Sequence, residues 1–185
     1  SLYCVAQPEP GSEEDLAAEG MRTDCRALIG GLGHLVRARP DICIDHAFLS
    51  QGMHKPTFEH FACALQVLRY AWWTMDKVIT YTTQGVSLGL SQDVEPRRPY
   101  DNKVEYGLYG MGDANLATPA PEGAPAQAKS MGGYTVMLGG GPVAWASYRF
   151  HTVCLASTVS ETLVASRLIA RIVPIRNIAQ FMGLI

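Results

Sequence analysis

The 185-residue sequence lacks most marks of a secreted or membrane-spanning protein. Its five cysteines are scattered and odd in number and include no CxxC pair, so neither a disulfide framework nor a zinc site is expected. No run of about 18 apolar residues occurs, which argues against a spanning helix, and the first residues contain no signal-peptide core. We therefore expect an intracellular protein with reduced thiols and no transmembrane segment.

Charge is also sparse and unevenly placed. Charged residues make up 17% of the chain and the net charge is −2, so the overall balance does not indicate nucleic-acid binding. The first 20 residues hold five acids and no Lys or Arg, whereas no Asp or Glu follows Glu161. We expect residues 1–20 to form an acidic polar leader.

The chain contains enough apolar residues, 48%, to build a core. Residues 21–82 carry apolar positions spaced by three and four, which predicts helices. The clearest of these helices follows Thr57, a good N-cap residue, and runs to about Trp73. Residues 83–103 contain prolines and mixed charge, which is typical of a linker.

Residues 104–185 change to strand-like patterns. A strand is expected before Asp113, a hairpin around Gly139-Gly140-Gly141-Pro142, and a further strand at 151–155. Ser157-Thr158 should cap a final helix that Pro174 kinks or splits. The predicted fold is α+β, with helices first and a β-β-β-α unit second.

Two blocks of motifs occur in order along this chain. The second block reads GDANLA near residue 110, then GGYTVMLGGGPVAW, then TVCLASTVSETLVA up to residue 165. The sequence of the two blocks resembles the Pol polyproteins of copia-type LTR retrotransposons, over roughly residues 20–182. The first block carries the resemblance through Arg39-Pro40-Asp41-Ile42, Met53-His54, Pro56-Thr57, His60 and Val67-Leu68-Arg69-Tyr70.

The resemblance implies a thumb-like reverse-transcriptase end at residues 21–82 and a partial ribonuclease H-like domain at residues 104–185. Such a domain cuts the RNA strand of an RNA–DNA hybrid with two divalent metals held by carboxylates. Asp113 matches the first-strand ligand and Glu161 the helix ligand, so both are the candidate catalytic and metal-binding residues. The cofactor would be Mg²⁺ or Mn²⁺ if the chain is active, and otherwise none.

The chain departs from the family pattern at several acids. Asn115 replaces the second Asp of D-A-D, Val159 replaces the first Glu of T-E-A-E, and no later acid follows. A catalytically incomplete segment is therefore expected, and a non-catalytic structural or RNA-associated subunit of a larger complex is the alternative. A purely structural interpretation of both acids also remains open. In it, Asp113 organises a turn beside Gly112, and Glu161 places a negative charge in the first turn of a helix, where it suits the helix dipole.

The last helix is expected to be basic. Arg167, Arg171 and Arg176 are the candidate nucleic-acid contacts, with RNA–DNA hybrid or RNA as the ligand. An anionic lipid surface, an acidic protein or plain solvent exposure would suit the same arginines. An incomplete sheet should also need a protein partner to cover it. Arg39 is expected to pair locally.

Overall fold

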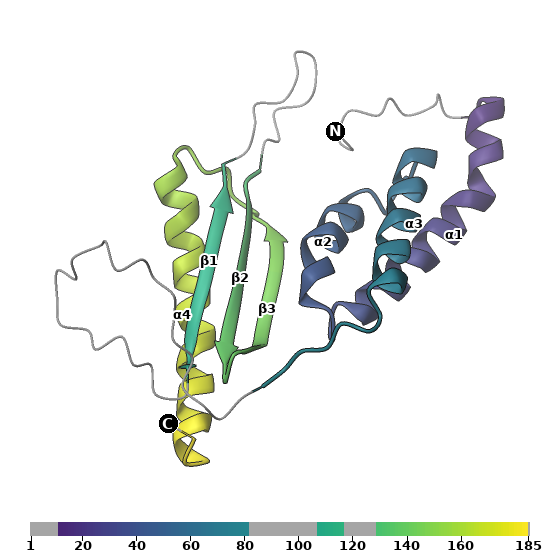
Figure 1. Cartoon of the computed structure of the whole chain (residues 1–185). Helices are drawn as coiled ribbons and strands as arrows, with labels where there is room; N and C mark the ends of the chain where they lie inside the picture. The colour runs from purple at the N-terminus through teal and green to yellow at the C-terminus, as the bar shows by residue number, and fades with distance from the viewer. Residues whose placement is uncertain (1–10, 82–106, 117–128, 185) are drawn as a thin grey trace, which may run out of the picture. The chain divides into compact units, whose positions relative to one another are not determined.

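The computed structural model describes residues 11–81, 107–116 and 129–184. These residues form helices and one antiparallel three-stranded sheet, which confirms the predicted α+β class. The chain divides between Val78 and Ile79 into two compact parts, the N-terminal unit and the C-terminal unit (Figure 1). The expected linker at 83–103 lies outside the described residues.

The first helix, α1 (Glu13–Leu35), begins inside the segment expected to be a leader. The Ser12 hydroxyl accepts a hydrogen bond from the backbone N–H of Asp15 at 3.2 Å. The Asp15 carboxylate accepts one from the N–H of Gly11 at 3.0 Å. Acids in the first turn also suit the positive end of the helix dipole. This capping explains why the acidic residues that follow Ser12 are helical.

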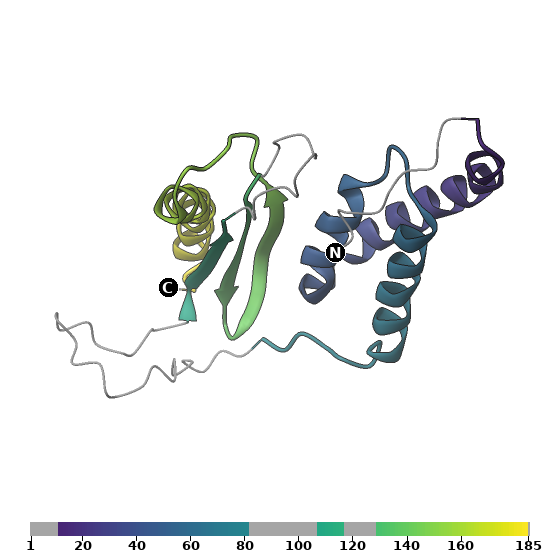
Figure 2. The same ribbon diagram turned by 90° about the horizontal axis from the view of Figure 1, so that it is seen from above.

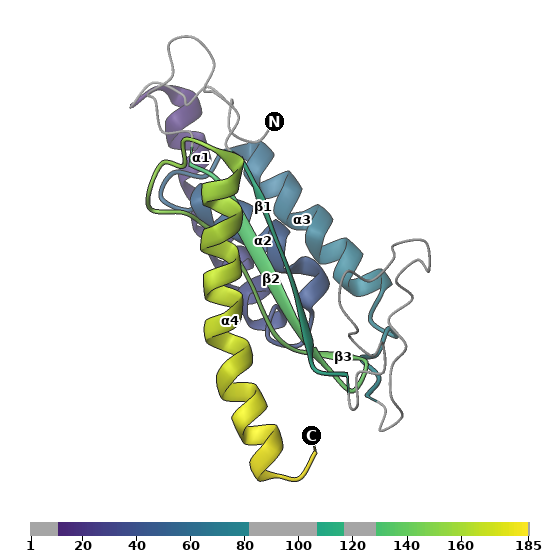
Figure 3. The same ribbon diagram turned by 90° about the vertical axis from the view of Figure 1, so that its left-hand side faces the viewer.

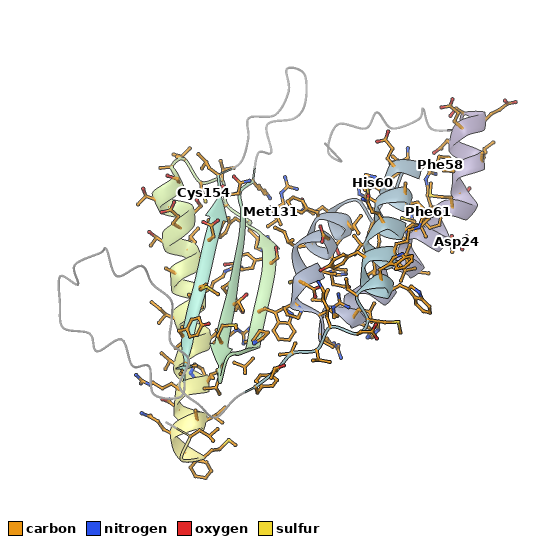
Figure 4. The ribbon with its side chains drawn as sticks, viewed as in Figure 1. Asp24, Phe58, His60, Phe61, Met131 and Cys154 are labelled. Atoms are coloured by element: carbon orange, nitrogen blue, oxygen red, sulfur yellow. The ribbon has the colours of Figure 1, made fainter. Side chains whose placement is uncertain are left out.

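The rest of the N-terminal unit consists of a 3-10 turn, η2 (Pro40–Ile42), and the helices α2 (Cys43–Gln51) and α3 (Phe58–Trp73). The bounds of α3 confirm the prediction for this segment. Thr57 caps the helix, because its hydroxyl accepts from the N–H of His60 at 3.4 Å and its own N–H donates to His60 Nδ1 at 3.4 Å. His60, labelled in Figure 4, is therefore part of a capping box.

Apolar side chains from all three helices meet in one core. Gly33 lets α1 approach α2, because an added Cβ would lie 2.8 Å from Nε2 of His46. The absence of a side chain at Gly33 thus leaves room for the ring of His46. Phe61 packs against the core from α3 (Figure 4). The buried members of the core are Cys25, Ile29, Leu32, Leu49 and Ala64.

Arg39 ties the end of α3 to η2. Its guanidinium donates to both carboxylate oxygens of Asp41, at 2.9 and 2.7 Å, and to the backbone carbonyls of Ala71 and Thr74, at 3.3 and 3.2 Å. The ring of Tyr70 lies 5.7 Å from the guanidinium, and the Tyr70 hydroxyl donates to Asp41 at 2.9 Å. The expectation that Arg39 pairs locally is confirmed.

The sheet of the C-terminal unit has the order β1-β2-β3, with both pairs antiparallel. Its strands are β1 (Tyr109–Asn115), β2 (Met131–Leu138) and β3 (Gly141–Arg149). The hairpin between β2 and β3 forms where expected, with φ of 59° at Gly139 and 80° at Gly140. These angles favour glycine, because side chains clash in that region.

The strand expected at 151–155 does not form. The sheet ladder ends where the N–H of Phe150 donates to the carbonyl of Ser130 at 2.9 Å, and β3 stops at Arg149. Strand β2 begins at Met131, so no paired strand extends far enough to hold residues 151–155 within the described part of the chain. This stretch instead connects β3 to the last helix.

The last helix, α4 (Ser157–Phe181), lies along one face of the sheet, as Figures 2 and 3 show. It covers β1 and β2 and encloses a core of Phe150, Cys154 and Val164. A helix of this length spans about 37 Å, so its C-terminal end runs past the strands (Figure 1). None of the helices in the described ranges is long and apolar enough to cross a membrane.

The structure corrects two expectations for α4. Pro174 lies inside the helix, which is not split there and continues to Phe181, because proline removes a single N–H donor. Ser157 and Thr158 do not cap it, since the N-cap is Ala156 and makes no side-chain bond. Ser157 and Thr158 are instead inside the first turn.

Candidate functional site

Asp113 lies on β1, one of the two edge strands of the described sheet. An added Cβ on Gly110 would meet Leu168 and Ile172 of α4, and one on Gly112 would lie 2.7 Å from Val164. Gly110 and Gly112 therefore face the helix. Side chains alternate along a strand, and the pairing of β1 with β2 is regular at this point. The side chain of Asp113 consequently leaves the sheet on the face away from α4.

Glu161 lies on the helix that covers the other face. It is exposed, while Ser160 before it is fully buried. The Ser160 hydroxyl donates to the carbonyl of Ser157 at 2.7 Å, so the polar group beside Glu161 is satisfied locally. Glu161 has no ion-pair partner among the described residues. Its place near the N-terminus of α4 suits a negative charge.

The two candidate ligands are thus separated by the sheet. A two-metal centre needs several carboxylate oxygens within reach of ions about 4 Å apart. Within the described ranges, no group of three or more His, Cys, Asp or Glu side chains is placed to hold a metal ion. The arrangement of Asp113 and Glu161 does not fit a Mg²⁺ or Mn²⁺ centre.

The three candidate arginines of α4 lie in different surroundings. The guanidinium of Arg167 lies over the ring of Tyr148 at 4.0 Å from its centroid and over Phe150 at 6.0 Å. Burial raises the pKa of Tyr148, although the charge of Arg167 acts in the opposite direction. Arg171 and Arg176 are exposed and have no acidic partner in the described part of the chain.

The arginines also point in different directions. Successive residues turn by about 100° around a helix, which places Arg167 and Arg171 about 40° apart. Arg176 lies about 180° from Arg167 by the same geometry. One side of α4 therefore carries Arg167 and Arg171, while Arg176 belongs to the opposite side.

Sequence reasoning missed the packing function of the glycines in the sheet. An added Cβ on Gly132 would lie 2.6 Å from Val164 and 2.8 Å from Phe150. Together with Gly110 and Gly112 it forms a surface without side chains that lets α4 approach the strands closely. Glycines spaced by two residues in a strand-like segment were the available signal, since such residues share one face.

Comparison with known proteins finds that the chain is similar to retroelement sequences. It is 31% identical over 139 residues to the retrovirus-related Pol polyproteins of transposons RE2 and RE1 from Arabidopsis thaliana. The matches cover 75% of this chain but 8% of each polyprotein, so the chain spans a small part of the length of these relatives. They support a retrotransposon Pol origin for the chain.

A third relative is much shorter. The chain is 29% identical over 141 residues to secreted RxLR effector protein 161 of Plasmopara viticola, with 76% of this chain and 82% of that protein covered. No protein-family model matches the chain, and no solved structure matches it.

Proposed function

We propose that this retroelement-derived chain is a reverse transcriptase/ribonuclease H-like segment of copia type that binds RNA–DNA hybrid inside the cell without cutting it. The observation that carries the proposal is the separation of Asp113 and Glu161 by the sheet in a chain similar to Pol polyproteins. The β-β-β-α order is compatible with a ribonuclease H-like arrangement. Residues 21–82 would then correspond to the thumb-like end.

The absence of cleavage follows from the placement of the acids. Hydrolysis of a phosphodiester by this chemistry requires metal ions that clamp the attacking and the leaving oxygen together. Two exposed carboxylates on opposite sides of a sheet cannot hold such a pair.

Hybrid binding is assigned to the side of α4 that carries Arg167 and Arg171. Arg167 is held by the aromatic ring of Tyr148, which fixes its position, and Arg171 lies one turn further along. No acid lies on the helix after Glu161, so the charge of these arginines is not neutralised within the helix. Guanidinium groups of this kind bind phosphate and release counterions.

The alternative function is a structural or RNA-associated subunit of a larger complex, recruited from a retrotransposon. The open face of the sheet favours it. Met111 and Thr135 pair across β1 and β2 on the face away from α4, and no helix of the described C-terminal unit covers them. A protein partner that covers this face would complete the fold.

The first experiment measures binding of a fluorescently labelled RNA–DNA hybrid by anisotropy at several salt concentrations. We expect salt-dependent binding that Arg171→Ala weakens several-fold, with a salt slope reduced by about 0.9 if one phosphate contact is lost. Arg176→Ala is the matched control, since the same charge is removed from the other side of the same helix. Equal effects of the two variants would contradict the assignment.

The second experiment asks whether the chain cuts the hybrid. The labelled RNA strand is incubated with the chain and Mg²⁺ or Mn²⁺, and the Asp113→Asn variant is tested in parallel. We expect no cleavage by either protein. Cleavage that Asp113→Asn abolishes would overturn the non-catalytic part of the proposal. Binding of neither hybrid nor RNA, by a folded chain, would favour the structural subunit.

A further inference from the structure

A groove of about 400 Å³ lies between α2 and α3 in the N-terminal unit. Its walls are mainly apolar, with Phe48 and Leu49 from α2 and Val67 from α3. Asp45 and Tyr70 add polar groups to the lining. The proposed hybrid contact on α4 does not use this groove, so its occupant is a separate question.

Asp45 gives the groove an unpaired negative charge. No Lys or Arg forms an ion pair with Asp45 among the residues that the structure describes. Partial burial raises the pKa of its carboxyl, and the negative charge of Asp41 raises it further. A cation brought to this position would relieve both effects. The groove therefore suits an apolar segment that carries one positive charge.

The chain itself displays such a segment on α4. Ile169 is 60% exposed and Val173 is 41% exposed, and the exposed Arg176 follows them. Their spacing of four and three residues keeps the three side chains within about 60° of one another on the helix. Val173 lies about 180° from Val164, the residue buried against the sheet. The Ile169–Val173–Arg176 stripe therefore faces away from the sheet of its own unit.

We propose that the groove between α2 and α3 of one copy binds the Ile169–Val173–Arg176 stripe on α4 of a second copy. The apolar residues would pack on Phe48 and Val67, and the Arg176 guanidinium would meet Asp45. An amphipathic helix that docks in an apolar groove through residues at i, i+4 and i+7 is a common recognition mode. The stripe spans about 10 Å along its helix and α2 about 13 Å, so the lengths agree.

The charges make the pairing selective. Each surface has apolar residues and one unpaired charge, and the charges have opposite signs. Pairing of α4 with a second α4 would bring arginines together, and pairing of two grooves would bring acids together. Two copies can each offer a groove and a stripe, so the contact forms either a reciprocal pair or an extended assembly.

Sedimentation velocity across a range of protein concentrations, without nucleic acid, tests the proposal. The unmodified chain should associate as its concentration rises. Arg176→Asp and Asp45→Arg should each weaken association about tenfold or more, since each places like charges in contact. The double variant, with both substitutions, should recover most of the association. Circular dichroism of each variant confirms that the exposed substitutions leave the helices intact.

Two matched controls isolate the contact. Arg171→Asp reverses a charge on another side of α4, and Asp24→Arg reverses an exposed acid on α1 (Figure 4). Both should associate like the unmodified chain. A chain that stays monomeric at every concentration would overturn the proposal. Association that either control weakens equally, or that the double variant fails to recover, would also overturn it.

Discussion

The two units hold their helices in place by different means. In the N-terminal unit, polar side chains reach backbone groups of neighbouring elements: Arg26 donates to the carbonyls of Met53 and His54, both at 2.9 Å, and Arg39 donates to Ala71 and Thr74. In the C-terminal unit, α4 approaches the sheet because the strands lack side chains at its contacts. Polar bonds fix direction, whereas an apolar contact of this kind depends on shape alone.

The same contrast separates the residues that resemble retroelement motifs. In the N-terminal unit, the motif residues Arg39, Asp41, Thr57 and His60 all have partners within the fold. In the C-terminal unit, the side chain of Asp113 is exposed and forms no ion pair with described residues. The motif residues of the N-terminal unit therefore stabilise its fold, while the carboxylate of Asp113 makes no comparable contact.

The largest expected effect tests the shape-dependent contact. Gly132→Val should destabilise the C-terminal unit by about 1–3 kcal/mol, because the added side chain overlaps Val164 and Phe150 in a filled core. Urea unfolding followed by native-state hydrogen exchange of α4 measures the loss. Gly30→Ala is the control in the other unit: an added Cβ there meets nothing within 4 Å, so a gain of about 0.5–1 kcal/mol is expected. Unchanged stability of Gly132→Val would show that α4 does not pack closely on β2.

The next effect tests the polar contacts. Arg39→Ala should destabilise the N-terminal unit by about 1–2 kcal/mol, since it removes five hydrogen bonds to Asp41, Ala71 and Thr74. The expected loss of stability is moderate because the ion pair between Arg39 and Asp41 is partly exposed. Arg39→Lys should lose most of the same stability, because the ammonium group of lysine cannot replace the planar guanidinium and its several N–H donors. Arg37→Ala, a neighbouring exposed arginine, should stay within about 0.5 kcal/mol.

The pH dependence of stability tests the same contact between Arg39 and Asp41. Hydrogen bonds from Arg39 and Tyr70 hold the pKa of Asp41 below its ordinary value. A depressed carboxyl pKa contributes stability that is present above the unfolded value, near 3.9, and is lost as pH falls through the folded value. The unmodified N-terminal unit should therefore lose stability below about pH 4, and Arg39→Ala should lose less over that window. Parallel acid losses in the two proteins would contradict the role of Arg39.

Local signals in the sequence were sufficient for several elements. The spacing of apolar residues with Thr57 as cap gave α3, and three consecutive glycines before Pro142 gave the hairpin. The start of α1 could also have been found, because Ser12 precedes three acids in a row that suit the first turn of a helix. Signals of this kind act within four residues and need no knowledge of the rest of the fold.

Features that depend on distant contacts could not be predicted in this way. Residues 151–155 have strand-like composition but lack a paired neighbour, and pairing is a property of the register rather than of the segment. The face on which Asp113 lies was equally hidden, because a shift of one residue would move it to the face of α4. The sequence showed which acids were present but not whether they meet.

A smaller effect tests the cap of α3. Thr57→Ala should destabilise the N-terminal unit by about 1 kcal/mol, because the hydroxyl that accepts from the N–H of His60 is lost. Thr57→Ser keeps an oxygen in this position and should retain most of the stability. Thermal and urea unfolding of both variants provide the measurement. Similar losses in the alanine and serine variants would assign the effect to the methyl group in the buried site rather than to the cap.

The smallest effect concerns Asp113. Asp113→Asn should change the stability of the C-terminal unit by less than about 0.5 kcal/mol, because the side chain is exposed and has no structural partner in the described ranges. Asp41→Asn is the matched substitution in the N-terminal unit, and it should destabilise measurably because Arg39 and Tyr70 both bond to that carboxylate. Urea unfolding of the two variants side by side measures the difference. A loss above about 1 kcal/mol for Asp113→Asn would mean that this acid stabilises the sheet, and the contrast between the two motif blocks would then disappear.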